Sequence, residues 1–173
     1  MSIQENRKEQ IIEKAIELFS KWGYYKTTTG LVAKAVGVTQ PYVFHFFKNK
    51  EELFKAVLDR AVDRLESAFI GIDAPADAVI DHMGHAFDDL LLHNRKEILM
   101  IMQSYSIAEP EIRLYVRGKF ERLYNVISGI LQKSGVENAP AVASQFIGMG
   151  LMITTSEVLE LPQLRLFKVS KHN

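Results

Sequence analysis

Apolar side chains recur at intervals of three and four residues along almost the whole chain, which is the spacing that places them on one face of an α-helix. No stretch alternates convincingly between apolar and polar residues with period two, as a half-buried strand would. Polar capping residues, glycines and prolines divide the pattern into successive helices. The sequence therefore predicts an all-α protein.

The predicted helices are of different lengths. The first is expected to end at Gly23, because glycine readily adopts the left-handed conformation that ends a helix. Asn49 and Glu52 form a capping signal for a long helix, and three more helices are expected between Pro75 and Gly135. The apolar face of the first helix is predicted to consist of Ile11, Ile12, Ala15, Leu18, Phe19 and Trp22.

The helix predicted after Asn138 is apolar on every side. A helix of this kind is buried on more than one side, so its own domain would cover one face and a second subunit another. The segment from Ala139 to Ser156 has no charged residue and is close to the minimum length of a membrane span. Pro140 and several Ser, Thr and Gly residues dilute its hydrophobicity, so we favour a homodimer interface over a membrane helix.

The strongest functional pattern lies in two short helices, the first expected to follow Thr28 or Thr29. Ala33, Gly37 and Val43 stand at i, i+4 and i+10. The small alanine lets two helices cross closely, the glycine makes the sharp turn, and the valine buries the second helix on the first. This is the helix-turn-helix pattern, whose second helix enters the major groove of DNA. Such triplets also arise by chance in helical proteins, so the spacing alone leaves DNA binding open.

Composition narrows the possible functions. The chain has no cysteine, which excludes disulfides, thiolate metal sites and cysteine nucleophiles. The formal net charge is zero, but residues 1–60 hold ten Lys and Arg against seven Asp and Glu, whereas the remainder holds eleven against fourteen. This asymmetry favours a polyanionic partner for the first part. The N-terminus lacks the apolar segment of a secretory signal, so we expect a cytoplasmic protein.

Sequence signatures of catalysis do not appear. There is no nucleophile–base pairing, glycine-rich phosphate loop or zinc-spaced motif, so we expect neither an enzyme nor a cofactor or metal. His82, His85 and Asp89 share one side of a helix, but they point away from its apolar stripe, which favours a solvated surface over a metal site. Two alternatives to DNA binding remain, a helical interaction module and, less favoured, a small-molecule enzyme.

A longer pattern surrounds the helix-turn-helix over about the first fifty positions. It consists of Arg7, Ala15, Leu18, Phe19, Gly23, Tyr24, Thr27, Thr28, Val32, Ala33, Ala35, Gly37, Val38, Thr39, Phe44, Phe47, Lys48, Lys50, Glu51 and Leu53. This pattern resembles the TetR family of bacterial transcriptional regulators. The resemblance implies a three-helix DNA-binding head, a linking fourth helix, and an all-helical body that dimerises and usually holds an inducer pocket. We therefore expect a DNA-binding domain at residues 1–48 and a regulatory and dimerisation domain at residues 49–173.

The resemblance also implies roles for particular residues. Gln40, Pro41 and Tyr42 open the helix that resembles the recognition helix. A glutamine amide pairs bidentately with adenine, and a proline ring packs on a thymine methyl group. Other positions resemble phosphate contacts, which orient a protein on DNA without reading its sequence. These positions are Thr28, Thr39 (also the predicted cap of this helix), Tyr42, His45 and Lys50.

Three positions depart from the family's pattern. Phe44 stands where the family usually has a tyrosine whose hydroxyl meets a phosphate, so that contact is absent here. Gly30 and Leu31 stand where other members often carry polar or basic residues that touch DNA. These departures affect individual contacts rather than the head as a whole.

In proteins of this family the inducer pocket lies among the fourth to eighth helices. The candidates here are Phe87, Met102, Gln103, Tyr105, Tyr124, Phe146 and Met149. Aromatic and methionine side chains at helical spacing are more often ordinary core, so that interpretation stays open. A mostly apolar lining would suit a small apolar inducer such as a drug, dye or lipid. We expect a repressor that binds a palindromic operator as a homodimer and is released by such a molecule.

Overall fold

Eight α-helices and one short 3₁₀ turn account for most of residues 3–165, the part of the chain that this computed structural model describes. No strand is present within these residues, so the predicted all-α fold is confirmed. The elements are α1 (Ile3–Lys26), α2 (Thr29–Val36), α3 (Gln40–Phe44), α4 (Lys50–Phe69), α5 (Val79–His93), α6 (Arg95–Ser104), α7 (Pro110–Lys133), α8 (Ala139–Leu159) and η1 (Pro162–Arg165).

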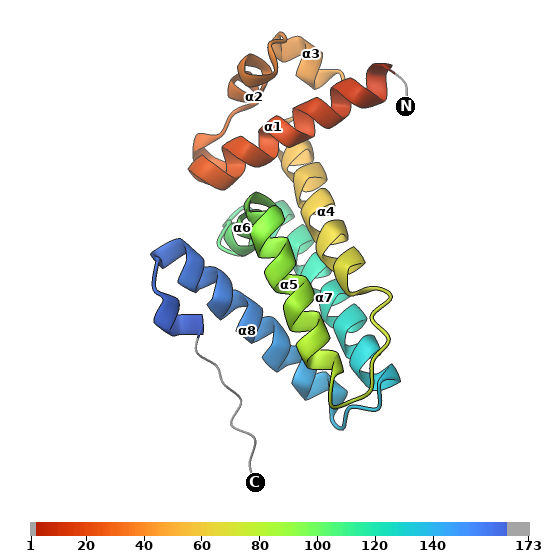
Figure 1. Ribbon diagram of the computed structural model, residues 1–173. Helices are drawn as coiled ribbons and strands as arrows, with labels where there is room; N and C mark the ends of the chain where they lie inside the picture. Colours follow the sequence, from red (N-terminus) through yellow and green to blue (C-terminus); the bar gives the residue numbers. More distant parts are fainter. Residues whose placement is uncertain (1–2, 166–173) are drawn as a thin grey trace.

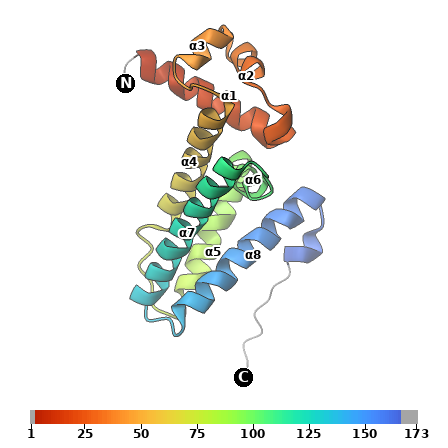
Figure 2. The same ribbon diagram turned by 180° about the vertical axis from the view of Figure 1, so that it is seen from behind.

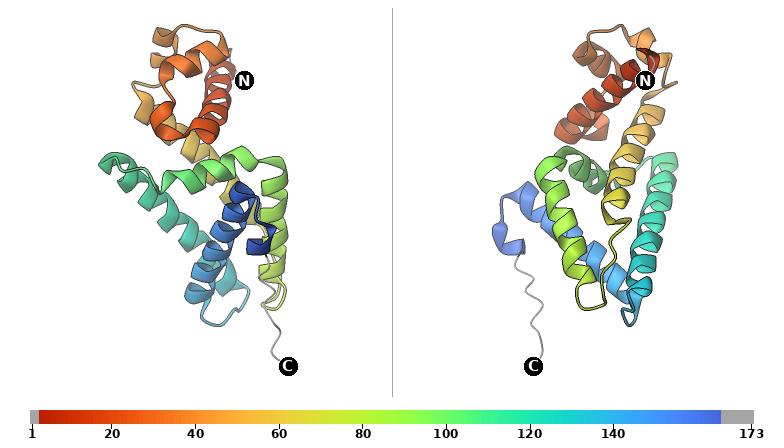
Figure 3. Two further views of the ribbon diagram at one scale, coloured as in Figure 1. Left: turned by 90° about the vertical axis from the view of Figure 1, so that its left-hand side faces the viewer. Right: turned by 45° about the vertical axis from the view of Figure 1, so that its right-hand side comes forward.

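The helices form a head and a body that share one long helix (Figure 1). The head consists of α1, α2 and α3 and lies at one end of the molecule (Figure 2). Helix α4 leads from the head along the body, where it packs against α5, α6 and α7. Helix α6 crosses the end of the body beneath α1, and these two helices pack together (Figure 3). The head therefore contacts the body through α6 as well as through α4.

Helix α1 is interrupted at Gly23, as the sequence predicts. Gly23 has φ 74° and ψ 175°, a non-helical conformation that ends the long first segment, and a second helical segment follows the kink to Lys26. Beyond the kink, the backbone N–H and the hydroxyl of Thr27 both donate to the Gly23 carbonyl, at 3.4 and 2.9 Å. Trp22 is 40% exposed, whereas Phe19 is fully buried. The predicted end of the first helix at Gly23 is therefore confirmed, whereas the predicted burial of Trp22 is wrong.

Helix α4 contributes to two regions of the core. Near its start, the ring of Phe54 makes edge-to-face contacts with Phe19 and Tyr24 of α1, with centroids 5.2 and 5.1 Å apart. At its end, the ring of Phe69 contacts Phe146 of α8 at 5.7 Å. Buried apolar side chains connect these two contacts along the helix in one continuous cluster. The head and the body are thus packed onto the same rigid element.

Polar side chains join α4 to α7. The Tyr115 hydroxyl donates to Asp59 at 2.5 Å, and Lys119 forms an ion pair with the same carboxylate. Burial and the hydrogen bond to Asp59 raise the pKa of Tyr115, so its hydroxyl remains a donor even at pH values where an ordinary tyrosine ionises. One turn further along α7, Arg122 pairs with Glu66, which is 1% exposed. A buried carboxylate is costly without its cation, so this pair fixes the register of α7 on α4.

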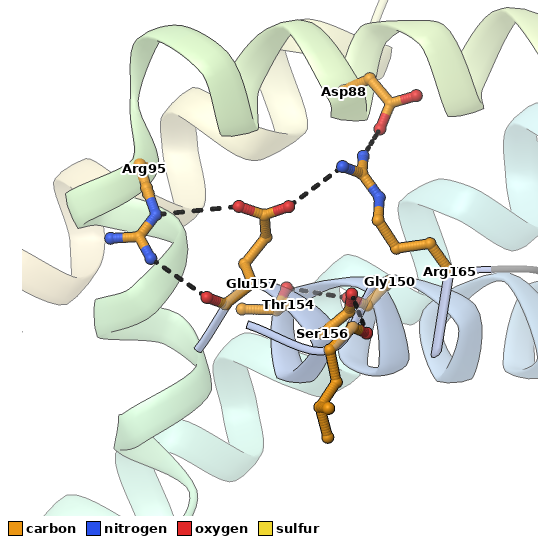
Figure 4. A network of polar contacts seen from close by, with 8 residues as sticks. Asp88, Arg95, Gly150, Thr154, Ser156, Glu157 and Arg165 are labelled. Atoms are coloured by element: carbon orange, nitrogen blue, oxygen red, sulfur yellow. Dashed lines mark hydrogen bonds and ion pairs between the residues drawn. The ribbon is translucent and has the colours of Figure 1, made fainter. Parts of the chain in front are cut away.

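The short turn η1 folds back onto α8 and α5 (Figure 4). The Ser156 hydroxyl donates to the carbonyl of Leu161 at 2.8 Å, and the Leu161 N–H donates to the Ser156 carbonyl at 3.0 Å. Arg165 then bridges Asp88 of α5 and Glu157 of α8, at 2.8 and 3.0 Å. These contacts hold the end of α8 beside α5.

We expect Phe54→Ala to lower the free energy of unfolding by about 3–5 kcal/mol, because the substitution leaves a cavity where the head meets α4. Urea denaturation followed by circular dichroism measures this change. Leu114→Ala is the control, since Leu114 is 65% exposed on α7 and should contribute less than about 0.5 kcal/mol. Equal effects of the two substitutions would contradict the packing described for Phe54.

Candidate nucleic-acid interface

Helices α2 and α3 have the geometry that the spacing of small and apolar residues predicts. Ala33 and Val43 are 2% and 0% exposed where the two helices cross. Gly37 has φ 76°, a left-handed conformation that glycine adopts at little cost. Its N–H donates to the carbonyl of Lys34, and the N–H of Val38 donates to that of Ala33. The turn therefore ends α2 and aims α3 across it, as a helix-turn-helix requires.

Most predicted DNA contacts share one face. Helices α2 and α3 form the end of the head that lies farthest from the body in Figure 1. The exposed candidates lie at the start of α2 and along α3, so the structure brings them together on that end of the head. They are Thr28, Thr39, Gln40, Pro41, Tyr42 and His45.

The two threonines at the helix starts differ in their bonds. The hydroxyl of Thr28 accepts a hydrogen bond from the N–H of Leu31 at 3.2 Å and so caps α2. Thr39 occupies the corresponding position of α3, but its side chain makes no capping bond. Its predicted position is thus confirmed, whereas the predicted capping bond is absent. Thr39 is exposed to solvent.

Aromatic side chains surround α3. Phe46 lies between Tyr42 and His45, with ring centroids 5.5 and 5.3 Å away. Phe47 is 4% exposed and belongs to the core, whereas Phe44 is 43% exposed and presents only carbon to solvent. The rings of Tyr42 and His45 therefore each pack against Phe46, while both residues remain exposed.

Lys50 lies at the first position of α4 and is bound within the protein. Its Nζ donates to the carbonyl of Tyr24 at 3.1 Å and lies 4.1 Å from the centroid of the Tyr24 ring. Burial raises the pKa of the Tyr24 hydroxyl above its usual value. Lys48 has an 86% exposed side chain and stands two residues earlier. We did not predict Lys48 as a DNA contact, although the Lys-x-Lys pattern that it forms with Lys50 indicated a second basic residue at this position.

The body contains an apolar cavity of about 50 Å³ among α4, α5, α6, α7 and α8. Three of the seven predicted ligand residues, Phe87, Met102 and Phe146, line it. Thr154 is its one polar residue, and its hydroxyl donates to the Gly150 carbonyl at 2.8 Å. The other lining residues are Leu65, Phe69, Ile98, Ile101, Phe120, Leu123, Ile127, Ile147, Gly150 and Leu151.

The other four predicted ligand residues lie elsewhere. Met149 faces a groove between α5 and α8. The Gln103 amide donates to the carbonyl of Ser20 in α1 at 3.0 Å. Tyr105 is 52% exposed, and the Tyr124 hydroxyl donates to the carbonyl of Pro140 at 3.4 Å. Helical spacing alone could not separate these positions from the ones that face the cavity.

Helix α6 joins this cavity to the head. Ile98, Ile101 and Met102 of α6 line the cavity, and the next residue, Gln103, bonds to α1. At the start of α6, Lys96 forms an ion pair with Glu17 of α1 at 3.2 Å. Beyond its end, the N–H of Ala108 donates to the hydroxyl of Tyr25, which in turn donates to Glu109. A displacement of α6 would therefore displace α1 as well.

Helix α8 leaves part of its apolar surface uncovered. One side packs on α7, while Ile80, Val142, Met149 and Met152 line an apolar groove of about 570 Å³ on the side toward α5. Among the described residues, α8 is the one helix whose length and composition would also allow it to cross a membrane. A helix of a soluble protein with one face against a partner has the same composition.

Comparison with known proteins places this head in a described family. Residues 11–57 match the model of the family "Bacterial regulatory proteins, tetR family". The match runs from α1 through α2 and α3 into α4, so it covers the helix-turn-helix and its joint with the body.

Similar proteins include an activator and a repressor. The HTH-type transcriptional activator FasR of Mycolicibacterium smegmatis is 26% identical over 156 residues, which cover 86% of this chain and 68% of FasR. The HTH-type transcriptional repressor ComR of Escherichia coli is 40% identical over 57 residues, which cover 33% of this chain and 27% of ComR. The stronger identity is thus confined to a short stretch.

The fold likeness extends over nearly the whole chain. The structure of AibR in complex with isovaleryl coenzyme A and operator DNA superimposes with a TM-score of 0.68 and 23% sequence identity. The superposition covers 86% of this chain and 86% of that chain. The body, as well as the head, therefore has the fold of such regulators.

Proposed function

Because the chain belongs to the TetR family of bacterial transcriptional regulators, we propose that it binds a palindromic operator as a homodimer and represses transcription until a small apolar molecule releases it. Its family and fold are those of DNA-binding regulators and not of enzymes. In this proposal residues 1–48 bind DNA, residues 49–173 dimerise and bind the ligand, and the protein acts in the cytoplasm.

The proposal that the protein binds DNA rests on which side chains of the helix-turn-helix are buried and which are exposed. The packing residues Ala33 and Val43 are buried, while the predicted contact residues of α2 and α3 are exposed together. We assign base reading to Gln40 and Pro41, whose chemistry suits adenine and thymine. We assign phosphate contacts to Thr28, Thr39, Tyr42, His45 and Lys50.

We expect Gln40→Ala to relax base preference at one position of each half-site, at a cost of about 1–3 kcal/mol. Lys50→Ala should weaken binding to all sequences and lower the slope of log affinity against log salt concentration by about one. Each full-length variant is used to select sites from a random duplex library and is then titrated at several salt concentrations.

Thermal unfolding of Lys50→Ala is the control, because this substitution also removes the contact with Tyr24. A changed base preference for Lys50→Ala, together with an unchanged one for Gln40→Ala, would show that the two roles are wrongly assigned.

Dimerisation through α8 is supported by its uncovered apolar groove. Met149 and Met152 lie on this groove, and Gly148 is exposed with no atom within 4 Å of where a Cβ would stand. Glycine at this position lets a second helix approach the backbone closely. Two identical heads related by a two-fold axis would then meet the two half-sites of a palindrome.

We expect Met149→Glu and Met152→Glu to convert the dimer to a monomer, because each places a charge in the apolar contact. Sedimentation velocity at micromolar protein concentration measures the change, with circular dichroism to confirm that the variant is folded. Leu114→Glu places the same charge on the exposed face of α7 and should leave the dimer intact. A wild-type monomer that still binds operator DNA would contradict the proposed dimer.

Ligand control is supported by the cavity and by what surrounds it. Sites for small organic ligands usually occupy about 300 Å³ or more, so a cavity of about 50 Å³ must expand before it accepts one. Its lining is almost wholly apolar, which suits a hydrocarbon group. The related fold of AibR holds isovaleryl coenzyme A, so acyl compounds are the first candidates.

Expansion of the cavity gives a physical route to release. Helix α6 supplies part of the cavity wall and is bonded to α1 through Gln103 and Lys96. A ligand that displaces α6 would therefore shift the head, and both half-sites would lose their fit at once because their spacing is fixed. The ligand must bind the shifted form more tightly than the operator-bound form, since equal affinity would shift nothing.

We expect an inducing ligand to bind about tenfold more weakly in the presence of operator DNA, which corresponds to about 1.4 kcal/mol of coupling. Calorimetric titration of acyl-coenzyme A thioesters and fatty acids, with and without operator, measures this difference. Gln40→Ala provides the control, because it should leave affinity for the ligand unchanged. Equal affinity in both titrations would reject the compound as an inducer, and failure of a broad apolar screen would favour another mode of control.

A further inference from the structure

A buried threonine holds the side chain of Gln40. Thr29, the first residue of α2, is 6% exposed, and its Oγ1 accepts a hydrogen bond from the Nε2 of Gln40 at 2.9 Å. Gln40 itself is exposed at the start of α3. A group fixed inside the head therefore restrains an amide that faces solvent.

The neighbouring position leaves room for this arrangement. A Cβ placed at Gly30 would lie 3.6 Å from the Oε1 of Gln40 and 3.7 Å from its Cδ. A longer side chain there would extend into the space beside the amide. Glycine at position 30, which departs from the family's pattern, is compatible with the contact between Gln40 and Thr29.

The fold of α2 does not require the Thr29 hydroxyl. Thr28 already caps this helix through the N–H of Leu31. No capping role therefore explains why the buried hydroxyl of Thr29 bonds to a side chain eleven residues away. Its bond to Gln40 instead links the two helices of the helix-turn-helix at their exposed ends.

We infer that Thr29 is a positioning residue that orients the Gln40 amide for base reading; the inference rests on the proposed function. A glutamine amide has one acceptor oxygen and two N–H donors. Because Thr29 takes one N–H, the oxygen and the other N–H remain, and these are the groups that pair with N6 and N7 of adenine. The restraint also reduces the side-chain entropy that Gln40 would lose on binding.

Thr29→Val tests this inference, because valine keeps the shape of the side chain and removes only the hydroxyl. The released Nε2 of the exposed Gln40 can bond to water, so the head should still fold. We expect preference at the Gln40 base position to fall by about 2- to 12-fold, the range of a single hydrogen bond. The measurement is site selection from a random duplex library with the full chain, at one salt concentration.

Three further variants isolate the role of the hydroxyl. Thr29→Ser should restore the preference, because serine keeps the acceptor. In a Gln40→Ala background, Thr29→Val should have no additional effect on preference. Thr155→Val, which removes a hydroxyl of α8 that bonds only its own helix, should leave the preference unchanged. If Thr29→Val fails to fold, Thr29→Ala removes the same hydroxyl with a smaller side chain.

The outcomes separate this inference from the proposed function. If Gln40→Ala relaxes the preference while Thr29→Val retains it, the inference about Thr29 is overturned and the interface stands. If Gln40→Ala itself retains the wild-type preference, the base-reading assignment fails and the inference fails with it. If Gln40→Ala and Thr29→Val both relax the base preference, and Thr29→Ser restores it, the inference is supported.

Discussion

The packing of α4 into both the head and the body is the constraint on which the rest of the structure depends. Phe54 anchors the start of this helix against α1, and Phe69 anchors its end against α8. Buried aromatic residues of this kind each contribute several kcal/mol, whereas an exposed ion pair such as Lys96–Glu17 contributes about 1 kcal/mol or less. The orientation of the head is therefore fixed mainly by apolar packing, while the polar contacts select one register.

This arrangement links the two proposed activities through helices that pack against one another. The head meets the body along α4 and again at α6, and α6 is also part of the cavity wall. A change in cavity size that displaces α6 therefore displaces a helix that already contacts the head. The small size of the cavity matters for the same reason, because a preformed site could fill without moving α6.

The sequence predicts the parts of this structure that depend on local spacing. The geometry of the helix-turn-helix was predictable from the spacing of Ala33, Gly37 and Val43. A small residue is needed where the helices cross, a glycine at the turn, and an apolar residue where the second helix packs on the first. Contacts between distant segments were not predictable in this way. The attachment of Lys50 to Tyr24 and the bond between Thr29 and Gln40 depend on how α1, α2, α3 and α4 pack, which periodicity does not encode. For the same reason helical spacing identified Phe87, Met102 and Phe146 in the cavity, but also residues outside it.

The central claim is that two rigid heads in one dimer are set to the spacing of an operator. The chain has no cysteine, so Glu13→Cys on the exposed side of α1 provides a single site for a spin label in each subunit. Distances between the two labels are measured by pulsed electron paramagnetic resonance with and without operator DNA. The account predicts a dipolar signal in both samples and one narrower distance distribution on operator. No dipolar signal, or a mean distance that operator shifts to a different value, would contradict it.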